Sequence, residues 1–166
     1  MVDAGYCLLM ARYNTWQNRQ YLSFLEPLEP KKLTRDRKAF FGSILGTLNH
    51  LLWGDAMWMS RFDGGAPPVG EIRDSPSLYP TLASFGASRI SMDARIERWA
   101  ALLMPDDLRG DLSWYSHAAR RDMALSKAAC VAHFFNHQTH HRGQVHAMLT
   151  SAGLNAPVSD LFLMPE

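Results

Sequence analysis

The chain has 166 residues, a length typical of one domain with a substantial hydrophobic core. Its 17 lysine and arginine residues nearly balance 16 aspartate and glutamate residues, so the formal net charge is only +1. This balance provides no field that would attract a nucleic acid or an anionic membrane, and we expect neither as a partner.

Four helical segments are predicted along the chain. The first covers about residues 3–25 and ends before the turn sequence EPLEP. The second begins near Thr34, a plausible N-cap, and continues to about residue 62, where the sequence DGGAPP ends it. The third lies within residues 80–105 and has apolar residues three or four positions apart. The fourth covers about residues 126–152 and is followed by a glycine suited to end a helix.

The stretch DLSWYSHAARRD, between the third and fourth helices, could form a short strand or an extended crossover. Four long amphipathic segments without a series of strands predict an all-α fold, a four-helix bundle formed by a single domain over residues 1–166. The long connection at residues 62–80 would let the chain cross the bundle. An up-down-up-down order is therefore not required.

The two cysteines, Cys7 and Cys130, lie in predicted helices and belong to no CxxC or zinc-ribbon motif. We interpret them as reduced thiols of a cytoplasmic protein. The apolar runs near the N-terminus are short and contain Asp3, Arg12 and Arg19, so they predict neither a signal peptide nor a membrane span.

Histidines are concentrated in the fourth helix, where four of the seven fall between residues 133 and 141. His137 and His141 are four residues apart in the middle of an apolar stripe, so their rings lie one turn apart on the same face. A single buried histidine is usually satisfied by a carbonyl or hydroxyl group. The ring nitrogens of two histidines in register are harder to pair with hydrogen-bond partners in a dry core, so the two favour a shared metal ion. The stripe consists of Cys130, Phe134, His137, His141, Val145, Met148 and Ala152.

A third ligand is expected from another helix, and His50 is the only histidine in the second one. Gly46 and Gly54 flank it one turn away on either side. Because each glycine inside a helix costs about 1 kcal/mol relative to alanine, the pair indicates either close helix approach or room for an ion. The opposite face of this helix is also apolar, which predicts burial or a subunit interface. That face carries Phe41, Leu45, Leu48, Leu52 and Met59.

Three neutral imidazoles without a carboxylate leave at least one coordination position for water, as in catalytic zinc sites. Nickel, copper and iron also accept nitrogen ligands, so ligand type alone does not select the metal. The helix carries HQTHH rather than HExxH, and the chain has no Glu-x-x-His, which excludes the usual zincin protease and di-iron motifs. Partners for the second ring nitrogens are expected among Asn14, Asn49, Asp55, Asn136, Gln138 and Gln144.

The remaining histidines are weaker candidates. His133 is the best substitute if the register is displaced, and His140 lies on the flank of the stripe. His146 points away from the stripe, and His117 lies in the crossover segment, from which it could approach the site. Arg142 also points away from the stripe, and we expect it to form a salt bridge on the bundle surface or at an interface.

The strings LNHLLWGDAMW and FFNHQTHHRGQVHAML resemble the DinB family of bacterial DNA-damage-inducible proteins, as do ARYNTWQNRQYL and DRKAFFGSILGTLNH. The resemblance implies an up-down-down-up four-helix bundle with a metal ion held at His50, His137 and His141. It also implies a homodimer and a relation to metal-dependent transferases and isomerases that use low-molecular-weight thiols. The name of the family refers to induction by DNA damage, not to DNA binding.

Three hypotheses follow for this chain. The first is an enzyme that uses one divalent ion, zinc or nickel, for transfer or hydrolysis on a small molecule, with a small thiol as a possible co-substrate. The second is a stress protein in which the ion stabilises the bundle without turnover. The third is an inert bundle with satisfied core histidines. Convergence of the three histidines beside a cavity open to solvent would favour the first, and convergence in a sealed core the second.

Overall fold

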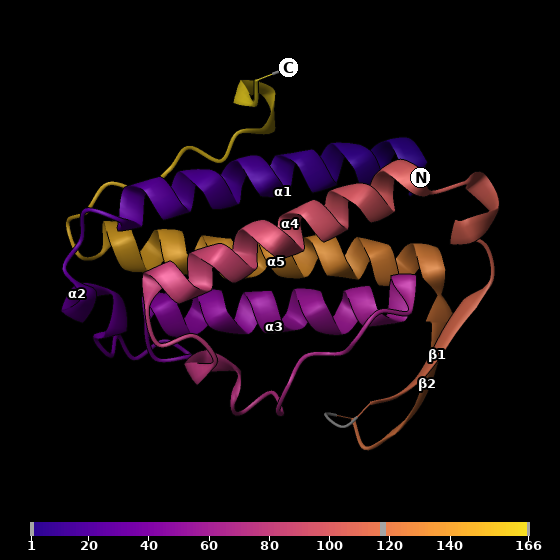
Figure 1. The fold of residues 1–166 in the computed structure, drawn as a ribbon, viewed down its shortest axis with the longest axis horizontal. Helices are drawn as coiled ribbons and strands as arrows, with labels where there is room; N and C mark the ends of the chain where they lie inside the picture. The colour runs from indigo at the N-terminus through magenta and orange to yellow at the C-terminus, as the bar shows by residue number, and fades with distance from the viewer. Residues whose placement is uncertain (1, 117–118, 166) are drawn as a thin grey trace.

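Four long helices dominate the computed structural model, which describes residues 2–116 and 119–165. In Figure 1, α1 and α5 run in one direction and α3 and α4 in the other. The long connection after α3 runs back to the end of the molecule where α3 begins, so α3 and α4 are parallel. The four helices are α1 (Ala4–Leu25), α3 (Ile44–Asp63), α4 (Leu82–Leu102) and α5 (Lys127–Thr150).

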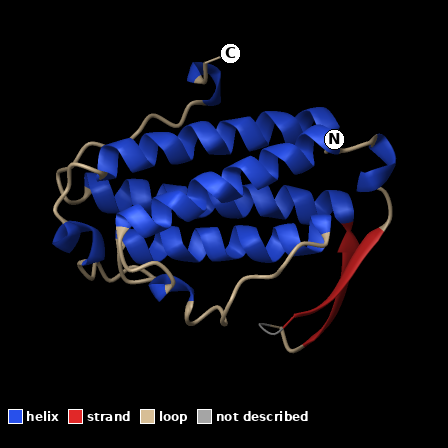
Figure 2. Ribbon diagram, in the orientation of Figure 1, coloured by secondary structure: helices blue, strands red, loops and turns tan. Residues whose placement is uncertain are grey.

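The prediction of a purely α-helical fold is wrong in one respect, because a two-stranded antiparallel sheet precedes α5 (Figure 2). Strand β1 (Asp111–Ser116) pairs with β2 (Arg121–Ser126), and Trp114 lies opposite Met123. Of the two predicted alternatives for this stretch, the strand is therefore confirmed. The described chain also contains a short helix α2 (Pro30–Thr34) and single 3-10 turns at η1 (Ser75–Ser77), η2 (Pro105–Leu108) and η3 (Leu161–Leu163).

The predicted start of the second long helix is also wrong. Thr34 ends the short helix α2, and α3 begins ten residues later with Ser43 as its N-cap. The Ser43 side chain accepts a hydrogen bond from the backbone N–H of Gly46. The intervening turn cannot continue a helix, because Lys38 and Gly42 both have positive φ angles, of 58° and 73°.

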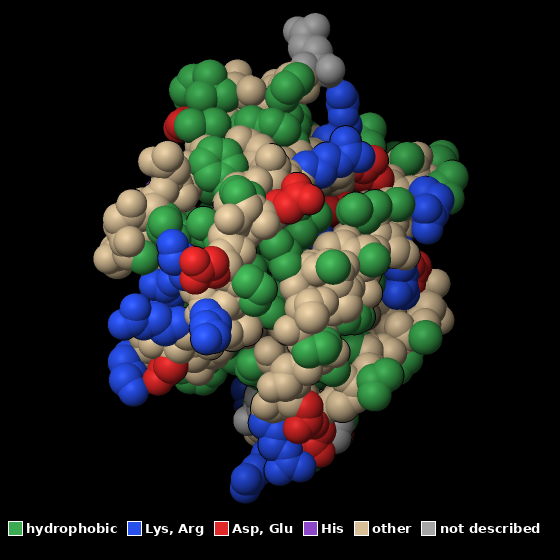
Figure 3. Space-filling view, turned by 60° about the vertical axis from the view of Figure 1, so that its left-hand side comes forward, with side chains coloured by type: hydrophobic (Ala, Val, Ile, Leu, Met, Phe, Trp, Pro, Cys, Tyr) green, Lys and Arg blue, Asp and Glu red, His purple; other side chains and the backbone are tan. Residues whose placement is uncertain are grey.

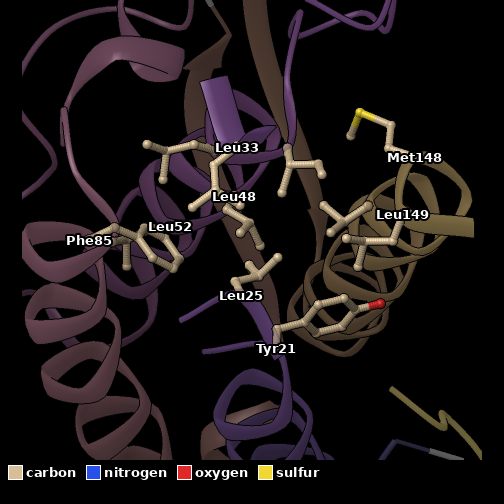
Figure 4. Packing of buried hydrophobic residues seen from close by; sticks show 11 residues of the cluster. Tyr21, Leu25, Leu33, Leu48, Leu52, Phe85, Met148 and Leu149 are labelled. Carbon is tan, nitrogen blue, oxygen red and sulfur yellow. The ribbon is translucent and has the colours of Figure 1, made fainter. Parts of the chain in front are cut away.

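The interior has two hydrophobic clusters, one at each end of the helices. The cluster in Figure 4 joins α1, α3, α4 and α5 near α2, and includes Tyr21, Leu48, Phe85 and Leu149. The other surrounds Phe134 near the hairpin. On each long helix, buried polar residues lie in the sequence between the positions belonging to the two clusters. This buried polar layer consists of Asn14, Gln17, Asn18, Asp55, Arg89, Asp93, Gln138 and Arg142.

Helix α3 is buried within its own chain, which accounts for its apolar character on nearly all sides. Every residue from 44 to 52 is buried, and α3 packs against α2, α4, α5 and the η1 turn. The apolar faces of α3 are therefore covered within one chain, and no second subunit is needed to cover them. Among the described residues, no helix is both long enough and apolar enough to cross a membrane.

Candidate metal centre

The structure brings His50 of α3 together with His137 and His141 of α5. The two helices are antiparallel neighbours, so one residue from α3 faces two successive turns of α5. One potential ligand atom from each of the three rings lies within 4.8 Å of the others. His50 and His141 are only 3% and 6% exposed, whereas His137 is partly exposed. The group therefore lies between two helices with one ring nearer to solvent.

Hydrogen bonds fix the tautomers of two of these rings. The Ser75 hydroxyl donates to the carbonyl oxygen of Ile72 at 2.6 Å, so its oxygen accepts from His50 Nδ1 at 3.0 Å. The Gln144 side-chain oxygen accepts from His141 Nδ1 at 2.8 Å. Both rings thus carry their proton on Nδ1, which leaves the Nε2 lone pair available to a metal ion.

The donor set fits a divalent transition metal. The Nε2 atoms of His137 and His141 are 3.0 Å apart, close to the separation of about 3.3 Å that two Zn–N bonds of about 2.0–2.1 Å give in a tetrahedral site. No carboxylate of the described residues belongs to the group. An ion here would have three neutral nitrogen ligands and at least one further position for water or another ligand.

Of the expected partners for the second ring nitrogens, Gln144 is found in contact with a ligand candidate, and Ser75 was missed. Ser75 lies in the connection between α3 and α4, where no spacing rule points to it. Asn49 holds that connection in place, because its side-chain NH₂ donates to the carbonyl oxygens of Pro76 and Tyr79 at 3.0 and 2.9 Å. Asn49 therefore acts on the site indirectly, by fixing the segment that carries Ser75.

An aromatic ring covers the histidine group. The Phe41 ring stacks on His50 with centroids 3.7 Å apart and lies 5.5 Å from the His141 ring. The predicted position of Phe41 on the opposite face of the helix is wrong, because Phe41 precedes α3 and does not follow its periodicity. The ring shields the imidazoles from water on this side.

Gly54 provides the space for the His137 ring. A Cβ atom at this position would lie 2.7 Å from Cε1 of His137, closer than carbon atoms approach without displacement. Of the two explanations for this glycine, close packing is therefore the supported one. The group that packs against Gly54 is the His137 imidazole. Gly46 has a different role, because a Cβ there would meet the backbone oxygen of Phe41.

Replacing Gly54 with alanine is expected to push the His137 ring away and to weaken zinc binding by about tenfold or more, equivalent to about 1.4 kcal/mol. Gly143→Ala is the matched control, since Gly143 lies in α5 with nothing within 4 Å of a new Cβ. The control should keep zinc affinity and gain up to about 1 kcal/mol in stability. Competition with a chelating dye measures the affinity. Equal zinc affinity in both variants would contradict this role of Gly54.

Burial keeps the three imidazoles neutral. Desolvation, followed by the neighbouring His141, lowers the pKa of His50 from 6.5 to about 4. Desolvation and the other histidines lower the pKa of His137 to about 3. Burial also lowers the pKa of His141, although its hydrogen bond to Gln144 opposes the change. All three rings are therefore unprotonated at neutral pH, the form that binds a metal.

The metal-free protein is expected to lose stability as the pH falls below about 6.5. In the unfolded chain each histidine binds a proton near pH 6.5, whereas His50 and His137 resist protonation down to about pH 4 and 3. Their contribution is thus complete above pH 6.5 and is lost as the pH falls toward the folded-state values, at up to about 1.4 kcal/mol per pH unit for each ring. Urea unfolding with a chelator present measures this slope. His50→Gln should reduce the slope, and an unchanged slope in this variant would contradict the assignment.

The buried polar layer lies directly beside the histidine group. Asp55 is fully buried and accepts from Arg89 Nη1 at 2.5 Å and from Gln138 Nε2 at 2.9 Å. Arg89 also contacts Asp93 at 2.9 Å. Gln138 follows His137 in α5, so this network ties the ligand-bearing turn of α5 to α3 and α4. Asp55 is occupied by these contacts and, within the described residues, forms no hydrogen bond with the ligand rings.

Arg142 departs from its predicted surface position. It is only 4% exposed, and its guanidinium lies over the Tyr13 ring at 5.6 Å. Burial lowers its pKa to about 10. The expected salt bridge is absent from the described residues, whose ion pairs do not include Arg142. The prediction failed because α5 packs against α1 as well as α3, so more of its circumference is buried than one stripe.

The other histidines remain outside the group. His133 is exposed, and its ring lies 5.9 Å from that of His137 and 5.1 Å from that of Trp58. His140 is exposed, with its Nε2 3.1 Å from the Gln144 side-chain nitrogen. His146 is half-buried, five residues beyond His141. His117 lies outside the described residues.

The four long helices and the three histidines that converge from two of them place this chain among helical proteins with a candidate metal centre. The family model of the DinB family matches residues 1–166, and the chain belongs to this family. It is similar to Protein DinB of Bacillus subtilis (strain 168), with 22% identity over 171 residues. That similarity covers 95% of this chain and 92% of the B. subtilis protein.

Proposed function

We propose that the chain binds one divalent ion, zinc or nickel, through His50, His137 and His141, within an up-down-down-up helical bundle. The observation that carries this proposal is the convergence of three neutral imidazoles from α3 and α5 within 4.8 Å. No other histidine or acidic side chain of the described residues belongs to this group, so the protein supplies three ligands. A coordination position therefore remains for water or a substrate atom.

We further propose that this ion serves an enzyme acting on a small molecule, in transfer of a low-molecular-weight thiol or in hydrolysis. When bound, the ion would act as a Lewis acid and lower the pKa of a water or thiol that it holds. The thiol must come from a second molecule. Burial raises the pKa of Cys7 to about 11 and also raises that of Cys130, so neither is a ready nucleophile.

The protein residues around the group orient the ligands. Ser75 and Gln144 each hold one imidazole by its Nδ1 proton, which fixes the ring planes before an ion arrives. Phe41 excludes water from the covered side. Partial exposure of His137 leaves one side of the group closer to solvent. These features favour a preorganised site with a restricted approach.

A second candidate is a stress protein in which the ion only stabilises the helices. The low exposure of His50 and His141 favours it, since a nearly closed site suits a structural ion. Protein purified without a nickel column, analysed for bound metal by mass spectrometry, tests ion binding. The loaded protein is then assayed for conjugation of glutathione, mycothiol or bacillithiol to an electrophile and for ester hydrolysis. Turnover lost with a chelator supports the enzyme, and stable metal binding without turnover supports the structural ion.

We also propose a homodimer. With α3 covered inside its own chain, the surface that joins two subunits would lie elsewhere, and α1 and α4 carry the exposed apolar residues Leu8, Leu9 and Ile90. Light scattering at micromolar concentration is expected to give twice the mass of the 18.7 kDa chain. A mass of one chain would contradict the dimer but not the histidine group, whose three members all belong to one chain.

A further inference from the structure

A surface cavity of about 720 Å³ lies between the segment 32–40 and the C-terminal part of α5. This volume is within the range of small-molecule sites. Methylene and methyl groups of α5 and the residues that follow it form part of its wall. It is lined by Lys32, Arg35, Asp36, Arg37, Lys38, Ala39, Phe40, Gln144, Ala147, Met148, Ser151, Ala152 and Leu154.

The lining is strongly cationic although the whole chain is nearly neutral. Four basic side chains and one acidic side chain face this cavity. Lys38 pairs with Asp36 at 2.9 Å. Within residues 2–116 and 119–165, no carboxylate lies in ion-pair contact with the other three cations, which are Lys32, Arg35 and Arg37. Lysine and arginine side chains gather at the left of the face in Figure 3, toward the end of the molecule that carries α2 in Figure 1.

The turn that carries these cations is held in one shape. The Arg37 N–H donates to the Gly42 carbonyl oxygen at 2.7 Å, and Arg37 Nη2 donates to the Lys32 carbonyl oxygen at 3.0 Å. Lys38 adopts a left-handed backbone conformation that is uncommon for a residue other than glycine. Nε of Arg37 is buried without a hydrogen-bond partner. The turn and the Arg37 side chain are thus held in place at a cost in backbone strain and desolvation.

Two residues of the cavity wall connect it to the histidine group. Gln144 lines the cavity, and its side-chain oxygen accepts from His141 Nδ1. Phe40 also lines it and contacts Phe41, whose ring stacks on His50. A molecule in the cavity would therefore be separated from His141 by one side chain, Gln144, and from His50 by two, Phe40 and Phe41.

We propose that this cavity binds the anionic end of the small-molecule substrate, a carboxylate or phosphate group, beside the metal centre. The inference rests on the proposed function for its catalytic context. Arginine guanidinium groups pair with both anions through two parallel hydrogen bonds, and lysine adds a point charge. The cations line one wall of a surface cavity of limited size rather than an extended stripe, which favours a small molecule over a nucleic acid.

The test uses the full chain freed of metal with a chelator, so that an anion cannot bind to the ion itself. Inorganic phosphate and citrate are titrated separately by calorimetry at low salt. Wild-type protein is expected to bind at least one of them saturably, with affinity that falls as salt rises. Arg35→Glu should weaken that binding by about tenfold or more. The relative strength of the two probes shows whether phosphate or carboxylate is preferred.

Arg98→Glu is the control, since Arg98 is exposed on α4, does not line the cavity and changes the net charge equally. It should alter binding less than about twofold. Lys32→Glu repeats the test if Arg35→Glu fails to fold. Absence of saturable binding, or equal weakening by Arg35→Glu and Arg98→Glu, would overturn the anion site. Zinc titration of Arg35→Glu reports on the metal centre separately, so failure of either proposal is recognised independently.

Discussion

Replacing His137 with alanine is expected to abolish the rise in melting temperature that zinc or nickel produces. The ring centroid of His137 lies 5.4 Å from that of His50 and 4.4 Å from that of His141, and its Nε2 is 3.0 Å from that of His141. Two remaining imidazoles hold an ion weakly. An ion that binds only the folded state at 1,000 times its dissociation constant adds about 4 kcal/mol of stability. Most of this amount should disappear in the variant.

The control for this substitution is His140→Ala. His140 is adjacent to His141 in sequence but exposed and outside the histidine group. It should keep both the bound metal, measured by mass spectrometry, and the metal-dependent melting, measured by calorimetry. A His137→Ala protein that retains its ion and its metal-dependent melting would refute the ligand set. Loss of the effect in both variants would show that the metal binds on the surface of α5 instead.

Replacing Arg89 with methionine is expected to destabilise the protein by about 3–5 kcal/mol, because it leaves Asp55 and Asp93 buried without their cation. Arg89 is 1% exposed and contacts both carboxylates, with Asp55 at 2.5 Å and Asp93 at 2.9 Å. A charge left in the core keeps its desolvation cost and loses its compensation. Urea unfolding of the metal-free protein measures the loss.

A second arginine of α4 provides the matched control. Arg95 pairs with Asp63 of α3 at 2.7 Å, but both side chains are about one-quarter exposed. Arg95→Met should therefore cost no more than about 1 kcal/mol. Equal losses of unfolding free energy in the two variants would show that the buried ion pairs of Arg89 stabilise the protein no more than the partly exposed pair of Arg95. Zinc affinity measured on folded Arg89→Met further tests whether Asp55 and Gln138 position the ligand-bearing turn of α5.

The pattern of residues along each helix was sufficient to find the histidine group. In α5, His137 and His141 occupy core positions of a regular stripe, and a side chain's face is set by helical geometry alone. His50 was found because it is the only histidine of its helix and has glycines on either side. The predicted ranges of the first and fourth helices also agree with α1 (Ala4–Leu25) and α5 (Lys127–Thr150) within a few residues, because helix ends depend largely on residues within one turn.

Tertiary packing decided the rest. The hydroxyl of Ser75 and the ring of Phe41 reach the site from loops, which have no periodicity to reveal their direction. Arg142 is buried because α5 packs against α1 as well as α3, and one stripe describes a helix with only one covered face. The cation-lined cavity likewise needs α5 beside a turn more than a hundred residues earlier. The periodicity of each helix predicted its main inward-facing stripe, but only the packing of distant segments determined which further faces are covered and what the buried side chains contact.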